Sequence, residues 1–196
     1  MGTSRGPRHF DPVIIGNRET DAWAAYYRRD WPTFLRASIG MVTAGFGMSP
    51  GKSLLGAWLV LRANQKWAPY PDNDPDAARE LMRRFYQLVG RATDELRIDP
   101  VRASRLEVEW WRLHRAHQHQ AGVSRSELEQ SLVELYAYVY DVAPESVRAA
   151  AAARVDAMDL SDAWVAAGCR ADDPVLGDER AALVTSYTAL RQAIAT

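Results

Sequence analysis

The segment Asp74-Pro-Asp-Ala-Ala-Arg-Glu-Leu-Met-Arg-Arg-Phe-Tyr-Gln-Leu-Val89 contains both signals that decide the fold of this chain. Aspartate followed by proline is typical of a helix start, because the carboxylate caps free amides and proline fits the first helical position. Leu81, Phe85 and Leu88 then recur at steps of four and three, which places them on one face of a helix. The segment is therefore predicted to be an amphipathic helix.

The same signals recur along the chain. Proline stands at an expected helix start in Trp31-Pro32, Ser49-Pro50, Asp99-Pro100 and Ala143-Pro144, and Ser124 to Glu127 has the pattern of a capping box. Helices are predicted near residues 20–30, 33–45, 50–66, 75–95, 100–119, 125–141, 144–167 and 178–194. The sequence thus predicts an all-α, single-domain bundle of seven or eight helices over residues 18–196, preceded by an extended N-terminal arm over residues 1–17.

Length and composition are those of an ordinary globular chain. The 196 residues suffice for one sizeable core, and 47% hydrophobic with 25% charged residues is typical of such domains. The formal net charge of −1 argues against nucleic acid as a partner. A single cysteine, Cys169, and a start without an apolar run favour a cytoplasmic protein. The longest uncharged run, Ala37 to Gly51, is 15 residues, too short for a spanning helix of about 20 residues.

The segment from Glu107 to His119 is the richest in side chains that bind ligands. It holds three of the four histidines and two of the seven tryptophans of the chain. Imidazole is the commonest metal ligand and indole is a broad stacking surface, so a metal, a haem and a flat organic molecule are all candidate ligands. His114 and His117 lie one helical turn apart, within reach of a shared ion, and Glu107 lies on the same stripe as His114.

These residues define a candidate ligand site. Its expected lining residues are Trp110, Trp111, His114, His117, Arg83 and Tyr138, and its expected metal ligands are His114, His117 and Glu107. A haem needs only one axial histidine, which this helix could supply. The alternative is a purely structural role, in which His117 packs inside the bundle while His114 and His119 face solvent. The paired Glu-x-x-His motifs of di-metal bundles do not occur, because no histidine follows Glu107 or Glu109 by three residues.

No acidic residue occurs between Asp30 and Asp72. The apolar side chains of this span predict a helical hairpin over residues 31–67 that presents a surface to a partner protein or to a second copy of the chain. This interaction surface is expected to include Phe34, Phe46, Trp58, Leu61 and Trp67. An anionic membrane surface is an alternative partner, since the only charges of the hairpin are basic. The hairpin could equally form the wall of an apolar pocket or the core of the bundle.

Three classes of function remain. The first hypothesis is a non-catalytic accessory subunit that docks a partner, or itself as a homo-oligomer, through the hairpin. The second is a bundle that binds a small molecule, a haem or a transition metal around the segment from Trp110 to His119, with an oxidoreductase as one form of it. The third is a peripheral membrane protein. No catalytic motif decides whether the chain is an enzyme.

Overall fold

Helix boundaries in the computed structural model follow the capping signals of the sequence closely. The structure describes residues 6–119 and 122–195, which form eight α-helices and one short 3-10 helix. The elements are α1 (Pro12–Tyr27), α2 (Trp31–Phe46), α3 (Pro50–Trp67), α4 (Pro75–Gly90), α5 (Pro100–Gln118), α6 (Arg125–Tyr140), η1 (Pro144–Val147), α7 (Arg148–Ala166) and α8 (Val175–Ala193). No strand occurs in these two described ranges, so the predicted all-α fold is confirmed.

Side-chain caps account for most of the helix starts. The Asp74 and Asp99 carboxylates accept hydrogen bonds from first-turn amides of α4 and α5, at 3.0 and 2.9 Å respectively. Ser124 and Glu127 form the predicted capping box at the start of α6. Each cap satisfies an amide that would otherwise lack a partner at the helix end.

The N-terminal arm is shorter than predicted. Helix α1 begins at Pro12, because the Asp11 carboxylate accepts hydrogen bonds from the backbone amides of Val13 and Ile14, at 2.8 and 3.2 Å. The predicted arm over residues 1–17 was therefore wrong over residues 12–17, which belong to α1. Residues 1–5 of that arm lie outside the described residues.

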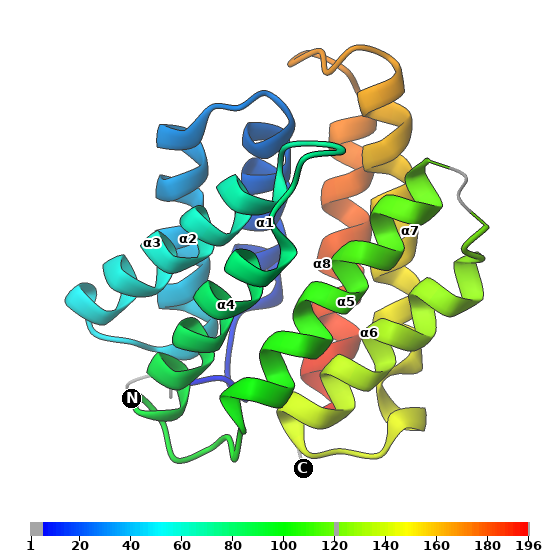
Figure 1. The fold of residues 1–196 in the computed structure, drawn as a ribbon. Helices are drawn as coiled ribbons and strands as arrows, with labels where there is room; N and C mark the ends of the chain where they lie inside the picture. Colours follow the sequence, from blue (N-terminus) through cyan, green and yellow to red (C-terminus); the bar gives the residue numbers. More distant parts are fainter. Residues whose placement is uncertain (1–5, 120–121, 196) are drawn as a thin grey trace.

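The helices follow one another around a closed ring (Figure 1). Each helix packs against its neighbours in the chain, and α8 packs against α1 to close the ring. Successive helices run in opposite directions, so the C-terminal ends of α1, α3 and α5 lie together, at the top of Figure 1. The N-terminal end of α1 and the C-terminal end of α8 lie in the lower part of that view.

The described part of the arm closes the bottom of the ring. Phe10 is buried and packs edge-on against Tyr187 of α8, with 5.9 Å between the ring centroids. The Arg8 guanidinium donates to the backbone carbonyl of Ile194 at 3.2 Å and to that of Tyr140. These contacts join the arm to the C-terminal ends of α6 and α8.

Candidate functional site

A cavity of about 240 Å³ lies inside the helix ring. All eight α-helices contribute side chains to its wall, and Phe10 of the arm lines it as well. Most of the wall is apolar or aromatic. Its large aromatic residues include Trp23, Tyr86, Trp110, Trp111, Tyr136 and Tyr187. We call this space the central cavity.

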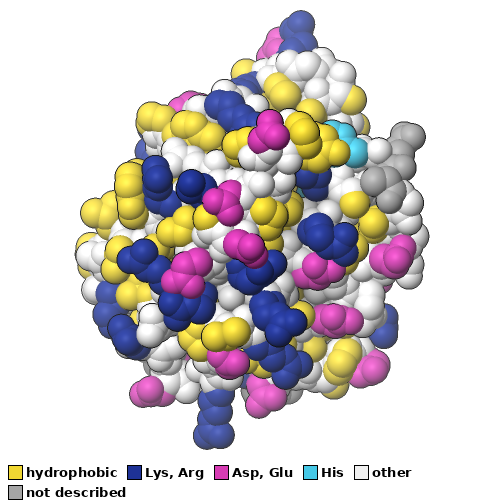
Figure 2. All heavy atoms as spheres, viewed as in Figure 1, with side chains coloured by type: hydrophobic (Ala, Val, Ile, Leu, Met, Phe, Trp, Pro, Cys, Tyr) yellow, Lys and Arg dark blue, Asp and Glu magenta, His cyan; other side chains and the backbone are white. Residues whose placement is uncertain are grey.

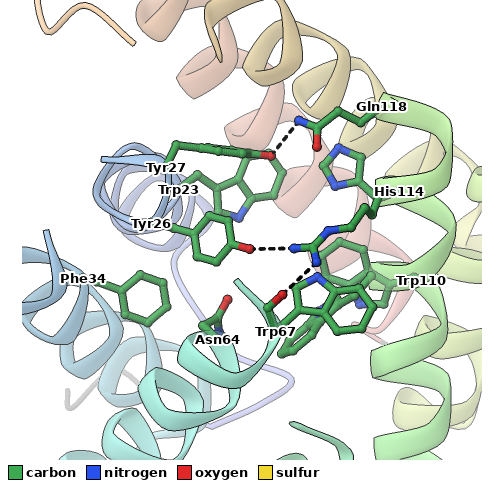
Figure 3. Close-up of a pocket in the computed structure, with 11 residues that line it drawn as sticks. Trp23, Tyr26, Tyr27, Phe34, Asn64, Trp67, Trp110, His114 and Gln118 are labelled. Atoms are coloured by element: carbon green, nitrogen blue, oxygen red, sulfur yellow. Dashed lines mark hydrogen bonds between the residues drawn. The ribbon is translucent and has the colours of Figure 1, made fainter. Parts of the chain in front are cut away.

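A smaller pocket of about 90 Å³ adjoins the central cavity at the top of the ring (Figure 3). Trp23, Phe34, Asn64, Trp110 and Trp111 line both spaces. The remaining lining residues of the small pocket are Tyr26, Tyr27, Trp67, His114, Arg115 and Gln118. Most of these are partly exposed, so this outer pocket connects the surface with the region of the central cavity.

Arg115 holds the wall of the outer pocket together. Its guanidinium donates to the backbone carbonyl of Trp67 at 2.7 Å and to the Tyr26 hydroxyl at 3.0 Å (Figure 3). It also lies over the Trp67 ring, 4.6 Å from the centroid. On the opposite side of the pocket, Gln118 donates to the Tyr27 hydroxyl at 3.2 Å and to Asp162 at 2.6 Å. These bonds connect the last turns of α1, α3, α5 and α7.

A buried ion pair between α1 and α7 forms part of the wall of the central cavity. Both terminal nitrogens of Arg154 on α7 donate to the Glu19 carboxylate on α1, one of them at 3.0 Å. Tyr187 donates to the same carboxylate at 2.5 Å. The Arg154 guanidinium also lies over the rings of Trp23, Trp110 and Tyr187, at 5.5, 5.3 and 5.8 Å from their centroids. Burial acts to lower the pKa of Arg154, but the charge of Glu19 outweighs it and keeps the guanidinium protonated.

Glu107 of α5 is the second carboxylate of the central cavity. It accepts hydrogen bonds from the Tyr86 hydroxyl at 2.7 Å and from the Trp111 indole nitrogen at 3.2 Å. Burial raises the pKa of the Glu107 carboxyl, although the Tyr86 hydrogen bond and the charge of Arg154 act in the opposite direction. No salt bridge to Glu107 occurs within residues 6–119 and 122–195.

Several buried polar atoms around the central cavity lack hydrogen-bond partners. The Trp110 indole nitrogen, the Tyr136 hydroxyl and the Arg154 Nε are buried, and none of the three has a hydrogen-bond partner among the described residues. All three side chains line the central cavity. Buried polar atoms without partners are rare in folded proteins, because each costs the free energy of its lost hydration.

The two histidines of the predicted metal site face acidic side chains of α7. His114 Nε2 lies 3.3 Å from an Asp162 oxygen, and His117 Nε2 lies 3.5 Å from an Asp159 oxygen. His117 Nδ1 also lies 3.0 Å from the backbone carbonyl of Val123. Glu107 bonds instead to Tyr86 and Trp111. No group of three or more His, Cys, Asp or Glu residues with metal-binding geometry is found in the described ranges, so the predicted metal trio is not assembled.

Arg83 and Tyr138 lie outside the site that they were predicted to line. Arg83 pairs with Glu80 on the same face of α4 at 2.6 Å, and both side chains are substantially exposed. The Tyr138 hydroxyl accepts a hydrogen bond from the backbone amide of Asp99 at 2.8 Å and its ring lies beneath Arg102. Neither residue lines the central cavity or the outer pocket. Trp110 and Trp111 line both spaces and His114 lines the outer pocket, as predicted.

Most of the predicted interaction surface is inside the protein. Phe34, Leu61 and Trp67 are buried, and Phe46 is partly buried and packs against Phe85. Phe34 and Phe46 line the central cavity. Only Trp58, which is 48% exposed, is free to meet a partner. The assignment of these buried side chains to a docking surface was therefore wrong.

Comparison of the chain with protein-family models, with curated proteins and with solved structures gives no match. Within the described ranges, no helix combines the length and the apolar character that crossing a bilayer requires. The geometry of the central cavity is consequently the main guide to function.

Proposed function

We propose that this protein binds a small, largely apolar organic molecule in the central cavity. The observation that carries the proposal is the size and position of this space, about 240 Å³ lined by side chains of all eight α-helices. For comparison, an engineered apolar cavity of roughly 150 Å³ is enough to bind benzene. A one- or two-ring molecule, or a short chain with a polar end, matches these dimensions.

Packing energetics support a ligand. Protein interiors are close-packed, and an unfilled cavity forfeits the dispersion contacts of every side chain that faces it. The walls also carry a few polar groups, Glu107 and the Glu19–Arg154 pair, on an otherwise apolar lining. Apolar walls with a small number of placed polar groups are typical of small-molecule sites. We expect a ligand to enter through the outer pocket, because its residues are mostly partly exposed and five of them also line the central cavity.

The side chains around the two spaces favour an organic molecule over a metal ion as the ligand. His114 and His117 face Asp162 and Asp159, and no metal-binding group is assembled in the described residues. Eleven of the 26 residues that line the cavity are aromatic instead. Stacking and burial of apolar area are therefore the main sources of affinity.

Filling the cavity is expected to abolish ligand binding. N-phenyl-1-naphthylamine is an uncharged probe whose fluorescence rises in apolar surroundings, and wild-type protein should give a saturable 1:1 titration. Ala22 lines the central cavity, so the larger side chain of Ala22→Leu should occupy part of the space that the probe needs. The affinity for the probe should fall at least about tenfold, while the helical circular dichroism is retained.

The matched control is Ala181→Leu, at an exposed position of α8. This variant should bind the probe as wild type does. Fluorescence that does not saturate, or an equal dissociation constant for Ala22→Leu and wild type, would contradict binding in the central cavity.

A second candidate function rests on the exposed face of α3, for which we propose contact with an anionic lipid surface. Leu54, Leu55 and Trp58 are each about half exposed and lie on one face of the first half of α3. Figure 2 shows hydrophobic side chains gathered at the left edge of the molecule, over α3, with Lys and Arg side chains beside them. Arg62 lies over the Trp58 ring at 5.9 Å.

The charge of this face favours lipid over a second copy of the chain. Residues 31–71 contain no acidic side chain, and Lys52, Arg62 and Lys66 flank the apolar residues on α3. Two copies meeting through this face would bring like charges together, whereas anionic headgroups attract each basic residue by roughly 1 kcal/mol. Tryptophan with neighbouring basic residues is also typical of proteins that lie at a membrane surface.

Sedimentation with lipid vesicles tests this second function. Wild-type protein should sediment with phosphatidylcholine vesicles that contain phosphatidylserine, less with vesicles that lack it, and less at high salt. The double variant Leu55→Ser, Trp58→Ser should lose about tenfold in affinity. Val101→Ser, at an exposed apolar position of α5, is the matched control and should change little. No sedimentation of wild type, or equal loss in the control, would count against lipid binding.

A further inference from the structure

The central cavity contains an imbalance of charge. Its ionisable lining residues, apart from tyrosines, are Glu19, Glu107 and Arg154. Arg154 and Glu19 form the buried ion pair, so their charges cancel. Glu107 receives hydrogen bonds from Tyr86 and Trp111, but neither donor carries a positive charge. The wall of the cavity therefore has one carboxylate more than it has cations.

Glu107 also borders space that a ligand can occupy. Glu19 is 3% exposed and is enclosed by Arg154 and Tyr187, whereas Glu107 is only partly buried. Since Glu107 lines the central cavity, a molecule in the cavity can contact it. A carboxylate in an apolar setting costs free energy unless a cation pairs with it, and the raised pKa of the Glu107 carboxyl reflects this cost.

We propose that the ligand of the central cavity is a hydrophobic amine whose ammonium group pairs with Glu107. This inference rests on the proposed function and specifies its ligand class. The ammonium would supply both the missing charge and hydrogen-bond donors to the carboxylate. The aromatic rings of Tyr86, Trp110 and Trp111, which lie in the same wall, would contribute cation–π attraction.

The protein already holds one of its own cations in this way. Arg154 is bound to a carboxylate and lies over three aromatic rings, those of Trp23, Trp110 and Tyr187. Glu107 and its aromatic neighbours offer a similar setting, but Glu107 forms no salt bridge with a cation of the described residues. An anionic ligand would instead add a second uncompensated charge beside Glu107.

Three ligands with one ring system and different charges test the proposal. They are 1,2,3,4-tetrahydro-1-naphthylamine, the corresponding 1-naphthol and the corresponding 1-naphthoic acid, which are cationic, neutral and anionic at neutral pH. Each is titrated against wild-type protein loaded with N-phenyl-1-naphthylamine. The amine should displace the probe at a concentration at least about tenfold lower than the alcohol, and the acid should be the weakest.

Two variants assign the preference to Glu107. Glu107→Gln keeps the shape of the side chain and removes its charge, so the amine and the alcohol should then differ by less than about threefold. The affinity for the alcohol should stay close to that of wild type. Glu109→Gln, two residues along the same helix and exposed, is the control and should keep the full preference for the amine.

The outcomes separate this inference from the proposed function. If the probe binds but the amine is no tighter than the alcohol, or the acid is the tightest, the amine inference is overturned while the cavity still binds ligands. A preference that persists in Glu107→Gln overturns it as well. If neither the probe nor any of the three ligands binds, both proposals fail. The wild-type ranking needs no variant, so it decides the question even if Glu107→Gln does not fold.

Discussion

Replacing Arg154 with methionine is expected to destabilise the fold by about 3–5 kcal/mol. The substitution leaves the Glu19 carboxylate buried without its cation, with only the Tyr187 hydroxyl still donating to it. Both side chains of the pair are less than a tenth exposed, so water cannot replace the lost partner. Urea denaturation followed by circular dichroism measures the change in the free energy of unfolding.

Two comparisons show that the loss comes from an unpaired buried charge. The double variant Glu19→Leu, Arg154→Met removes both charges and should be clearly more stable than Arg154→Met alone. Arg83→Met breaks an exposed pair with Glu80 and should cost far less than Arg154→Met, because water solvates both side chains. An Arg154→Met variant as stable as Arg83→Met would mean that the ion pair is not buried in solution.

The helices were predictable because their signals are local. A cap such as Asp99 and the apolar positions behind it lie within a few residues of each other, so the sequence alone locates both. The missed start of α1 carried the same signal, since Asp11 is followed by Pro12 as Asp74 is by Pro75. Ring closure by α8 against α1 was not predictable, because it depends on contacts such as that of Gly16 with Val184, far apart in the chain.

The candidate site was predictable only where its residues are close together in sequence. Trp110, Trp111 and His114 form a cluster that is visible in the sequence. The structure places them in the walls of the central cavity and the outer pocket. Glu19 and Arg154 meet across 135 positions and were missed. Each is a charged residue on an otherwise apolar helical stripe, which is the local signal of a buried ion pair, but nothing in one sequence says which two such residues meet.

The apolar hairpin shows the opposite error, in which a local pattern was assigned to the wrong environment. A span without acidic residues predicts burial, but it does not distinguish burial inside the bundle from burial against a partner. Phe34 and Leu61 face the interior because α2 and α3 are two members of a closed ring. The exposed residues of α3, such as Trp58, share the composition of the buried ones. What separates the two groups is which face of the helix is turned toward the interior of the ring.

Glu179→Gln is expected to stabilise the protein at alkaline pH. Glu179 of α8 is fully buried, and neither carboxylate oxygen has a hydrogen-bond partner among the described residues. Burial, and next to it the charge of Glu19, raise the pKa of its carboxyl from an ordinary value of 4.5 to about 8, although Ser161 and Arg180 act in the opposite direction. Glutamine has the same shape and cannot ionise, so it avoids the cost of a buried charge.

The pH dependence of this effect follows from proton linkage. Between the ordinary pKa of 4.5 and the raised value of about 8, the folded state holds a proton on Glu179 that the unfolded state has released. The stability contributed by this group is therefore complete below the lower value and is lost as pH rises, at roughly 1.4 kcal/mol per pH unit. Wild type and Glu179→Gln should consequently differ little at pH 5 and by a few kcal/mol at pH 8.

Urea denaturation of both proteins at pH 5 and at pH 8 measures this difference. Glu134→Gln, an exposed position on α6, is the matched control, because it removes an equivalent charge from a solvated surface. Its free energy of unfolding should follow that of wild type at both pH values. If the free energy of unfolding of Glu179→Gln exceeds that of wild type by no more at pH 8 than at pH 5, the carboxyl is hydrated or paired in the folded protein. A gain confined to pH 8 would show that α8 buries a protonated acid at neutral pH, so that the packing of α8 becomes weaker as the solution becomes alkaline.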